Sequence, residues 1–207
     1  MGPDLRRTSH VLWFIVALPA MSVGVAWLSF HLLTVVTWKY AFVLDGLGVL
    51  SAYSLFFQLF DRFAWRWRIF RWLRIVEQPL MAGRWRAVLK TSRESTDPIQ
   101  AVVEIRQTFT HSTVNMYFEQ SRSVSLMTQF VKDGNGFISL HYEYQNVPGA
   151  DAEPTMYTHF GTARLECVPG KPTLKGEYYN RGRDDRGHVG TLFLDWVGDR
   201  LLNRFED

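Results

Sequence analysis

Two short clusters combine tyrosine, amide and arginine side chains, and they are the part of the sequence best suited to bind a small polar ligand. In the first cluster, strand alternation places Tyr142, Tyr144 and Asn146 on one face. The second cluster contains Tyr178, Tyr179, Asn180, Arg181 and Arg183. Tyrosines stack on nucleobases, amides hydrogen-bond to base edges and arginines pair with phosphates. The clusters therefore predict a nucleotide site, unless they are an ordinary strand pair with outward-facing polar side chains.

The two faces of the second cluster limit how the site can be built. Alternation places Tyr178 and Asn180 on one face of their strand and the other three residues of the cluster on the opposite face. Residues on opposite faces cannot line one cavity, so some of them must be structural. We expect Tyr179, Arg181 and Arg183 to form one ligand set and the first cluster to form another.

The sequence contains no pattern of residues that is typical of a catalytic site. We find no nucleophile motif, phosphate-binding loop or metal-ligand spacing. Cys167 is the only cysteine, which excludes an intramolecular disulfide and a zinc site built on several cysteines. His141 and His159 have no carboxylate or second histidine at ligand spacing. The sequence predicts a protein that is not an enzyme and has no metal or other cofactor.

The elements that carry the two clusters are predicted to be β-strands, because hydrophobic residues alternate with a period of two from Gly83 onward. The predicted strands are 83–91, 99–109, 112–119, 123–132, 136–146, 157–168, 172–183 and 188–196. With no helix between them, consecutive strands should pair antiparallel and close into a small eight-stranded barrel. Such a barrel is filled by side chains or holds one small ligand. The opening Gly83-x-Trp85 resembles the start of lipocalin-like barrels, in which the tryptophan closes one end.

The first sixty residues predict two transmembrane helices. Residues 11–36 carry no charge at neutral pH, and residues 40–60 carry only Asp45. Roughly 20 apolar residues cross a bilayer as a helix. A cleaved signal peptide is less consistent with the first segment, because its apolar run is too long and a second one follows at once. We therefore divide the chain into a membrane part, 1–76, and a β-barrel domain, 77–207.

Basic residues predict how these helices are oriented. Residues 1–80 contain eight Lys or Arg and four Asp or Glu; subtracting these from totals of 23 and 20 leaves fifteen and sixteen for residues 81–207. Arginines flank both ends of the helical pair, whereas the connecting turn has only Lys39. The positive-inside rule then places both termini and the barrel in the cytoplasm.

Several residues of the membrane part suggest specific contacts. Asp45 is either a hydrated interfacial carboxylate or the mark of an oligomer contact or ion path. The neighbouring Gly46 and Gly48 would allow close helix packing. Residues 60–76, which include Arg62, Arg66 and Arg68, have apolar side chains at helical spacing with arginines between them. This pattern predicts a basic juxtamembrane helix in contact with anionic lipid.

Two stretches of the barrel give the sequence a recognisable similarity. They are His-Phe-Gly-Thr-Ala-Arg-Leu at 159–165 and Gly-Glu-Tyr-Tyr-Asn-Arg-Gly-Arg at 176–183. Together with the two predicted spans, they resemble the two-transmembrane, β-strand-rich effectors of bacterial CBASS antiphage systems. The resemblance covers nearly the whole chain, and the second stretch is its most specific part.

This resemblance implies a function. In that family the cytoplasmic barrel binds a cyclic dinucleotide, oligomerises, and disrupts the inner membrane of the infected cell. The implied partners are the cyclic dinucleotide, membrane lipids and further copies of the chain, but no DNA or RNA polymer. The resemblance adds Thr162 to the two clusters as a ligand-facing candidate.

Two other functions fit the sequence. A membrane-tethered lipocalin-like carrier of a lipid or other apolar ligand would need an interior that is mainly aliphatic. The second predicted strand, with Val103 and Ile105 on one face and Glu104 and Arg106 on the other, does not decide this. A structural subunit of a membrane complex would use the two clusters as surface contacts.

Overall fold

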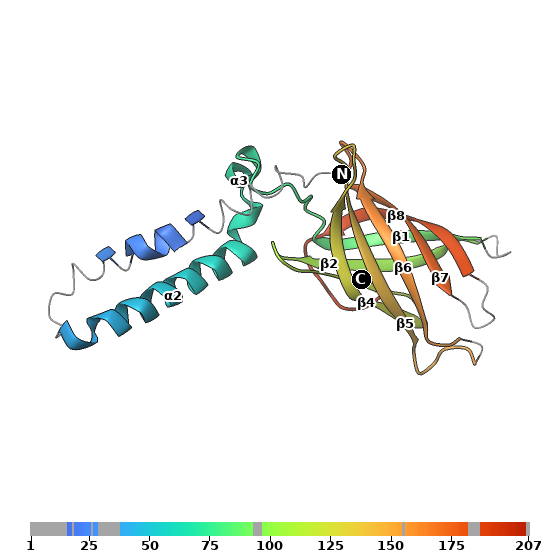
Figure 1. The fold of residues 1–207 in the computed structure, drawn as a ribbon. Coiled ribbons are helices and arrows are strands. Elements are labelled where there is room, and N and C mark those ends of the chain that lie inside the picture. The colour runs from blue at the N-terminus through green and yellow to red at the C-terminus, as the bar shows by residue number, and fades with distance from the viewer. Residues whose placement is uncertain are drawn as a thin grey trace. The chain divides into compact units, whose positions relative to one another are not determined.

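The computed structural model describes residues 16–17, 19–25, 27–28, 38–92, 97–154, 156–181 and 187–205, with the backbone alone at 38–47, 181 and 187. The chain forms two compact units, Met1–Glu77 and Gln78–Asp207. Figure 1 shows helices in the first and a β-barrel in the second.

The helical unit is built around one long helix. It contains α2 (Trp38–Arg62), the 3-10 helix η1 (Ala64–Arg66) and α3 (Arg68–Trp72). The second predicted span, 40–60, lies within α2, whereas most of the first, 11–36, lies outside the described residues. Among the residues that the structure describes, no helix combines the length and the apolar character required to cross a bilayer.

The basic segment 60–76 is not one continuous helix, unlike the sequence-based expectation. Trp67 is extended, with φ −68° and ψ 139°, and separates η1 from α3. The rings of Phe60 and Phe70 meet edge to face with centroids 5.1 Å apart, and Trp65 is fully buried. Packing of these aromatic side chains therefore breaks the helix that the spacing of apolar residues predicts.

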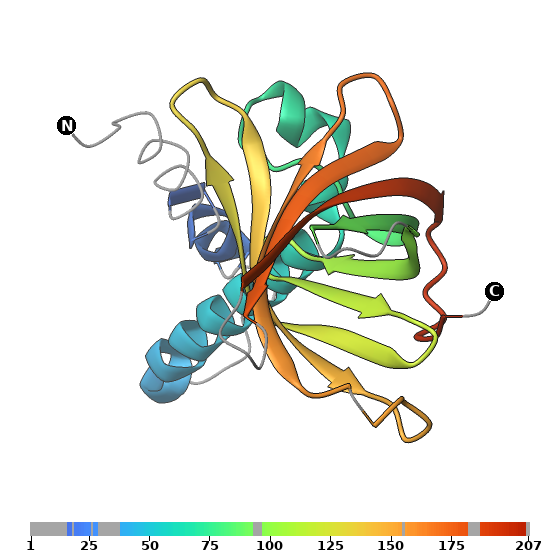
Figure 2. The same cartoon turned by 90° about the vertical axis from the view of Figure 1, so that its right-hand side faces the viewer.

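The second unit is a closed barrel of eight strands in the order β1 to β8, and β1 pairs with β8 (Figures 1 and 2). Every neighbouring pair is antiparallel. The strands are β1 (Gly83–Thr91), β2 (Ile99–Gln107), β3 (Ser112–Tyr117), β4 (Ser121–Lys132), β5 (Ile138–Pro148), β6 (His159–Cys167), β7 (Thr173–Arg181) and β8 (Gly187–Gly198). The predicted eight-stranded antiparallel barrel is confirmed.

One end of the barrel is sealed by the segment that leads into β1. Met81 is fully buried, its N–H is bound by Gln107 Oε1 at 2.9 Å, and Gln107 Nε2 donates to the carbonyl oxygen of Pro79 at 2.9 Å. Trp85 Nε1 donates to the carbonyl oxygen of Met81 at 3.0 Å. Aliphatic side chains such as Ile105 and Leu194 fill the interior beside this sealed end.

The end of the chain is fastened to the outer face of β1 and β2. Arg84 and Glu104 form a buried ion pair with Nη1 and Oε1 2.8 Å apart. The Glu104 carboxylate also accepts hydrogen bonds from the backbone N–H groups of Leu202 and Asn203. Arg84 Nη1 donates to the carbonyl oxygen of Arg204. Residues 202–205 therefore cover a charge pair that would otherwise face water.

Candidate functional site

The end of the barrel opposite the sealed end is lined by polar side chains, and we call it the polar end. It is the end at which β5 and β7 finish and β4 begins. Asn146 of β5 pairs with Ser123 of β4 and His159 of β6. Asn180 of β7 pairs with His188 of β8. Hydroxyl, amide and imidazole groups from five strands thus surround one end of the interior.

The two asparagines differ in how their hydrogen bonds are used. Asn146 is buried, and its Nδ2 donates to Ser123 Oγ at 2.9 Å and to Ser121 Oγ at 3.3 Å. Asn180 Nδ2 lies 3.4 Å from His159 Nε2, while its Oδ1 is buried with no hydrogen-bond partner among the described residues. A buried carbonyl oxygen without a donor is costly in a folded protein. Asn180 therefore offers a ready acceptor to an incoming N–H group.

Three tyrosines lie below this polar rim. The ring centroids of Tyr142 and Tyr144 are 6.1 Å apart, and both residues are buried; Tyr178 packs against the same core. Burial, followed by the nearby tyrosine hydroxyl, raises the pKa of Tyr142 and of Tyr144 well above the ordinary value. Both phenols are therefore neutral at physiological pH and would not repel a phosphate.

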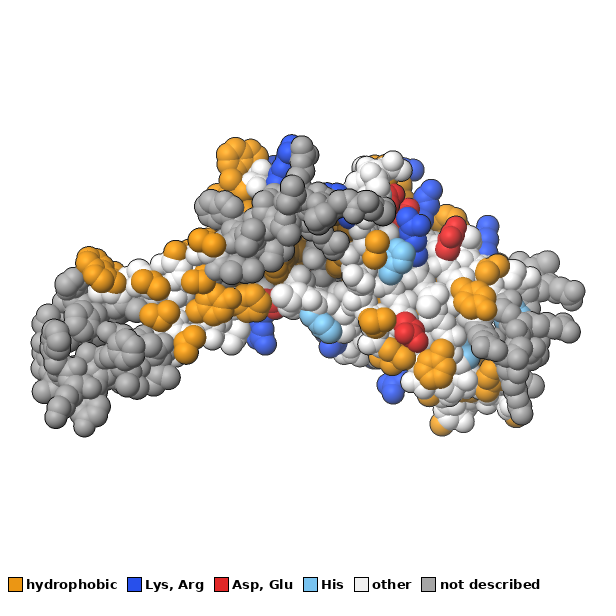
Figure 3. All heavy atoms as spheres, in the orientation of Figure 1, with side chains coloured by type: hydrophobic (Ala, Val, Ile, Leu, Met, Phe, Trp, Pro, Cys, Tyr) orange, Lys and Arg blue, Asp and Glu red, His pale blue; other side chains and the backbone are white. Residues whose placement is uncertain are grey.

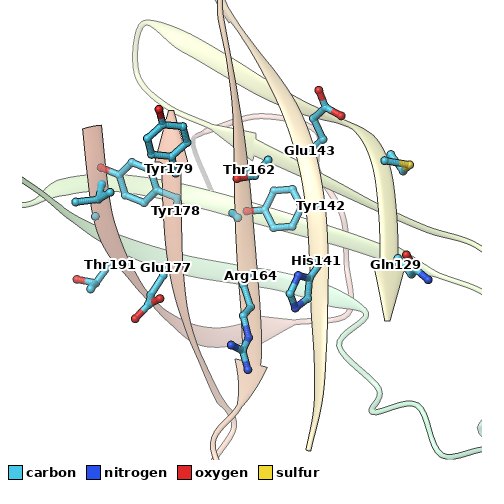
Figure 4. A pocket seen from close by; sticks show the side chains of 14 residues that line it. Gln129, His141, Tyr142, Glu143, Thr162, Arg164, Glu177, Tyr178, Tyr179 and Thr191 are labelled. Carbon is cyan, nitrogen blue, oxygen red and sulfur yellow. The ribbon is translucent and has the colours of Figure 1, made fainter. Parts of the chain in front are cut away.

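A hollow crosses the outer face of β4 to β8. It is a trough of about 690 Å³, and Figure 4 shows the side chains that line it, among them Thr162 and Tyr179 and also Tyr142 and Tyr178. Met127, Tyr179 and Val189 give one side of the trough an apolar character. We call it the outer trough.

The charges of the outer trough are unfavourable for an anionic ligand. Glu143 and Glu177 both line it. Its arginine, Arg164, forms an ion pair with Glu166. Burial, and then the nearby Arg164, lower the pKa of His141, so this imidazole is neutral at pH 7. The trough thus offers a doubly negative ligand little net attraction.

The structure divides the ligand-facing candidates between these two places. The first cluster and two residues of the second point into the interior: Tyr142, Tyr144, Asn146, Tyr178 and Asn180. Thr162 and Tyr179 line the outer trough, which Tyr142 and Tyr178 also border. Arg181 ends β7 at the polar end, and Arg183 lies outside the described residues. The interior therefore joins the first predicted set to Tyr178 and Asn180, which the sequence-based grouping had placed in neither set.

Some polar residues of the interior were not predicted from the sequence. Ser121 and Ser123 alternate along β4, and His188 enters the rim from β8. Serines at every second position, beginning with Ser121, were a usable signal. His188 gave no such signal, because its neighbours in the sequence do not indicate which face of the strand is inside.

The predicted membrane residues all belong to the helical unit. The side chain of Asp45 is not described, and Gly46 lies in the same backbone-only segment. A Cβ added at Gly48 would have no heavy atom within 4 Å. Arg62, Arg66 and Arg68 are exposed, and the Arg66 guanidinium lies 5.6 Å from the Trp65 ring centroid.

Comparison with known protein families gives one match that covers the barrel. The model of the family described as "Cap15, cyclic dinucleotide receptor domain" matches residues 76–195, which include both ligand clusters. A search of curated proteins finds no match for this chain.

Proposed function

Because this chain belongs to the Cap15 cyclic dinucleotide receptor family, we propose that it is a CBASS antiphage effector whose barrel binds a cyclic dinucleotide. The observation that carries this proposal is the polar end of the interior. Buried amides, hydroxyls and aromatic rings meet there, and Asn180 Oδ1 has no donor among the described residues.

The interior is a better site for this ligand than the outer trough. A cyclic dinucleotide carries two phosphates, each with one negative charge, and Glu143 and Glu177 would repel them in the trough. The interior offers neutral donors instead, including the hydroxyls of two tyrosines with raised pKa values. We place the ligand in the interior.

Positive charge for the phosphates would come from the end of β7. Arg181 is the last residue of this strand, on the face opposite Asn180, so it would have to reach a ligand in the interior over the rim of the polar end. Arg183 follows two positions later in the sequence. Arginine pairs with phosphate oxygens through two parallel hydrogen bonds. These two side chains are our candidates for the phosphate contacts, even though the barrel as a whole is close to neutral.

The helical unit would deliver the response at the inner membrane, with both termini in the cytoplasm. Leu50, Leu55 and Leu59 are 64%, 57% and 47% exposed along α2, and apolar side chains of this unit are visible in Figure 3. Two apolar segments, with arginines on their outer flanks, support insertion into lipid. Ligand binding would favour an oligomer, and Gly46 and Gly48 would let its helices pack closely enough to disturb the bilayer.

The lipid-carrier alternative is favoured only by the sealed end of the barrel. Val103, Ile105 and Leu165 are fully buried there, as an apolar ligand would require. The polar end does not suit such a ligand, because an alkyl chain would leave the buried Asn180 Oδ1 without a hydrogen-bond donor. The mixed interior therefore fits a nucleotide better than a lipid.

A panel of cyclic dinucleotides tests the proposal on the purified full chain. One member, at about 100 times its Kd, should raise the melting temperature by about 5–10 °C, whereas the matching linear dinucleotide should not. The same member should release dye from vesicles that contain the protein. No shift with any member, or binding without dye release at any protein density, would contradict the receptor or the effector part respectively.

A further inference from the structure

Two inward-facing tyrosines lie directly over glycines of the neighbouring strand. Tyr144 of β5 pairs with Gly161 of β6, and Tyr178 of β7 pairs with Gly190 of β8. A Cβ added at Gly161 would lie 2.5 Å from both Cζ and the hydroxyl oxygen of Tyr144. At Gly190 it would lie 2.3 Å from Cε1 and 2.5 Å from Cζ of Tyr178. Each ring therefore occupies the space that a side chain on the next strand would need.

This packing determines where the rings lie. The outer part of each ring covers the glycine backbone, since the nearest atoms are Cζ and the hydroxyl oxygen of Tyr144, and Cε1 and Cζ of Tyr178. Tyr144 lies over β6 and Tyr178 over β8, with β7 between the two glycine-bearing strands. Tyr144 is 7% exposed and Tyr178 is half-buried, so a base would reach either ring face by displacing side chains that pack on it. The interior thus holds two aromatic rings at separate places on its wall.

Asn180 lies between these rings. It pairs with Gly161, the residue under the Tyr144 ring, and it is two positions along β7 from Tyr178. Its buried Oδ1 has no donor among the described residues. Each of the four RNA bases carries at least one N–H group that such an oxygen can accept.

We propose that Tyr144 and Tyr178 are stacking platforms, one for each base of the bound cyclic dinucleotide, and that Asn180 hydrogen-bonds to a base edge between them. This inference rests on the proposed function and adds the way in which the bases are held. Stacking is tolerant of base identity, since every base has an aromatic face. The hydroxyl groups of the two tyrosines are secondary to their rings in this arrangement.

Calorimetric titration of the full chain separates stacking from hydrogen bonding. We expect Tyr144→Phe and Tyr178→Phe to bind within about threefold of the unmodified protein, because the ring is kept. Tyr144→Leu and Tyr178→Leu should each bind about 5- to 150-fold more weakly. The matched control is Phe160→Leu, which removes an exposed aromatic ring from the outer face of β6 and should leave the affinity unchanged.

A fluorescent ligand gives a readout of stacking itself. A cyclic dinucleotide with 2-aminopurine at one position should lose fluorescence on binding, and one of the two leucine variants should restore it at saturating protein. Asn180→Leu should weaken binding but keep the quenching. Circular dichroism and a cooperative melt, recorded for every variant, identify any variant that fails to fold. If a leucine variant does not fold, the stacking proposal is tested by the affinity of the corresponding phenylalanine variant and by the fluorescence of the bound ligand.

The results distinguish failure of the proposed function from failure of the stacking platforms alone. If the unmodified chain binds no cyclic dinucleotide, the proposed function fails and the platforms fail with it. If it binds one and both leucine variants, shown to be folded, bind equally well, only the platforms fail. A loss in the phenylalanine variants as large as in the leucine variants would also overturn stacking.

Discussion

At the scale of single residues, the buried hydroxyl of Tyr142 should have opposite effects on folding stability and on ligand binding. Its hydroxyl is buried with no hydrogen-bond partner among the described residues, and burial raises its pKa. An unsatisfied buried hydroxyl costs about 1–3 kcal/mol of folding free energy. A residue kept at that cost suggests a role in the bound state.

Tyr142→Phe should therefore raise the free energy of unfolding by about 1 kcal/mol at pH 7, while weakening ligand binding. The pH dependence of the free energy of unfolding in the alkaline range provides a second test. The folded pKa of Tyr142 lies above the unfolded value of about 10, so the unfolded state ionises first, and Tyr142 alone lowers the free energy of unfolding by up to about 1.4 kcal/mol per pH unit above pH 10. The Tyr142→Phe variant should lose less free energy of unfolding than the unmodified protein above pH 10.

Urea unfolding at pH 7 and between pH 10 and 11 measures both effects. Tyr179→Phe, a change of the same kind on the outer face, is the control and should have little effect on stability. A less stable Tyr142→Phe protein with unchanged ligand affinity would show that the hydroxyl is structural.

The sequence predicted which residues share a face, but not which face is inside. Tyr142, Tyr144 and Asn146 do lie together, as alternation requires. On β7, however, Tyr178 and Tyr179 make both faces polar and aromatic, so parity alone could not choose between them. The choice depends on Gly190, which leaves room for the Tyr178 ring inside the barrel.

At the scale of elements, the strands followed closely from the sequence. The predicted first strand, 83–91, has the observed bounds, because its alternation is regular and its ends carry turn residues. The ends of strands were predicted less well where contacts between strands determine how far each strand extends. β4 and β5 extend to the pair Ser121 and Pro148, beyond the predicted ends, because they pair with each other over that length.

The covered ion pair on β1 and β2 could not have been predicted from the sequence. Alternation placed Glu104 only on the face opposite Val103 and Ile105. On the outer face a carboxylate is usually solvated, and only the tertiary fold brings residues 202–205 over it. Its partner Arg84 is also buried. The pair therefore fastens the end of the chain to the barrel.

Removing one member of this pair should lower the free energy of unfolding by a large amount. Glu104→Ala leaves Arg84 buried without its carboxylate and frees the backbone N–H groups of Leu202 and Asn203, at a cost of about 3–5 kcal/mol. Urea unfolding measures the loss. Glu143→Ala, which removes an exposed carboxylate from the outer trough, should change stability by no more than about 0.5 kcal/mol. Equal effects in the two variants would show that the covered pair contributes nothing special.

At the scale of the whole molecule, the barrel has two chemically different ends. The sealed end is aliphatic and is joined by Gln107 to the segment that leads back to the helical unit. The polar end collects the amides, serines and tyrosines of the candidate site. Alternation and turn residues predicted the closed barrel, whereas this asymmetry depends on strand register, which the sequence alone does not fix.

The chemistry of the residues indicated a nucleotide, and the family match to residues 76–195 narrows the ligand to a cyclic dinucleotide. Neither observation says where the ligand lies. From the polar side chains we infer that it lies inside the barrel, at its polar end.

An experimental structure of the full chain with its cyclic dinucleotide tests that claim most directly. We expect the ligand in the interior, with bases against Tyr144 and Tyr178, a base edge on Asn180, and phosphates toward the end of β7. Ligand bound in the outer trough, against Thr162 and Tyr179, would contradict the account.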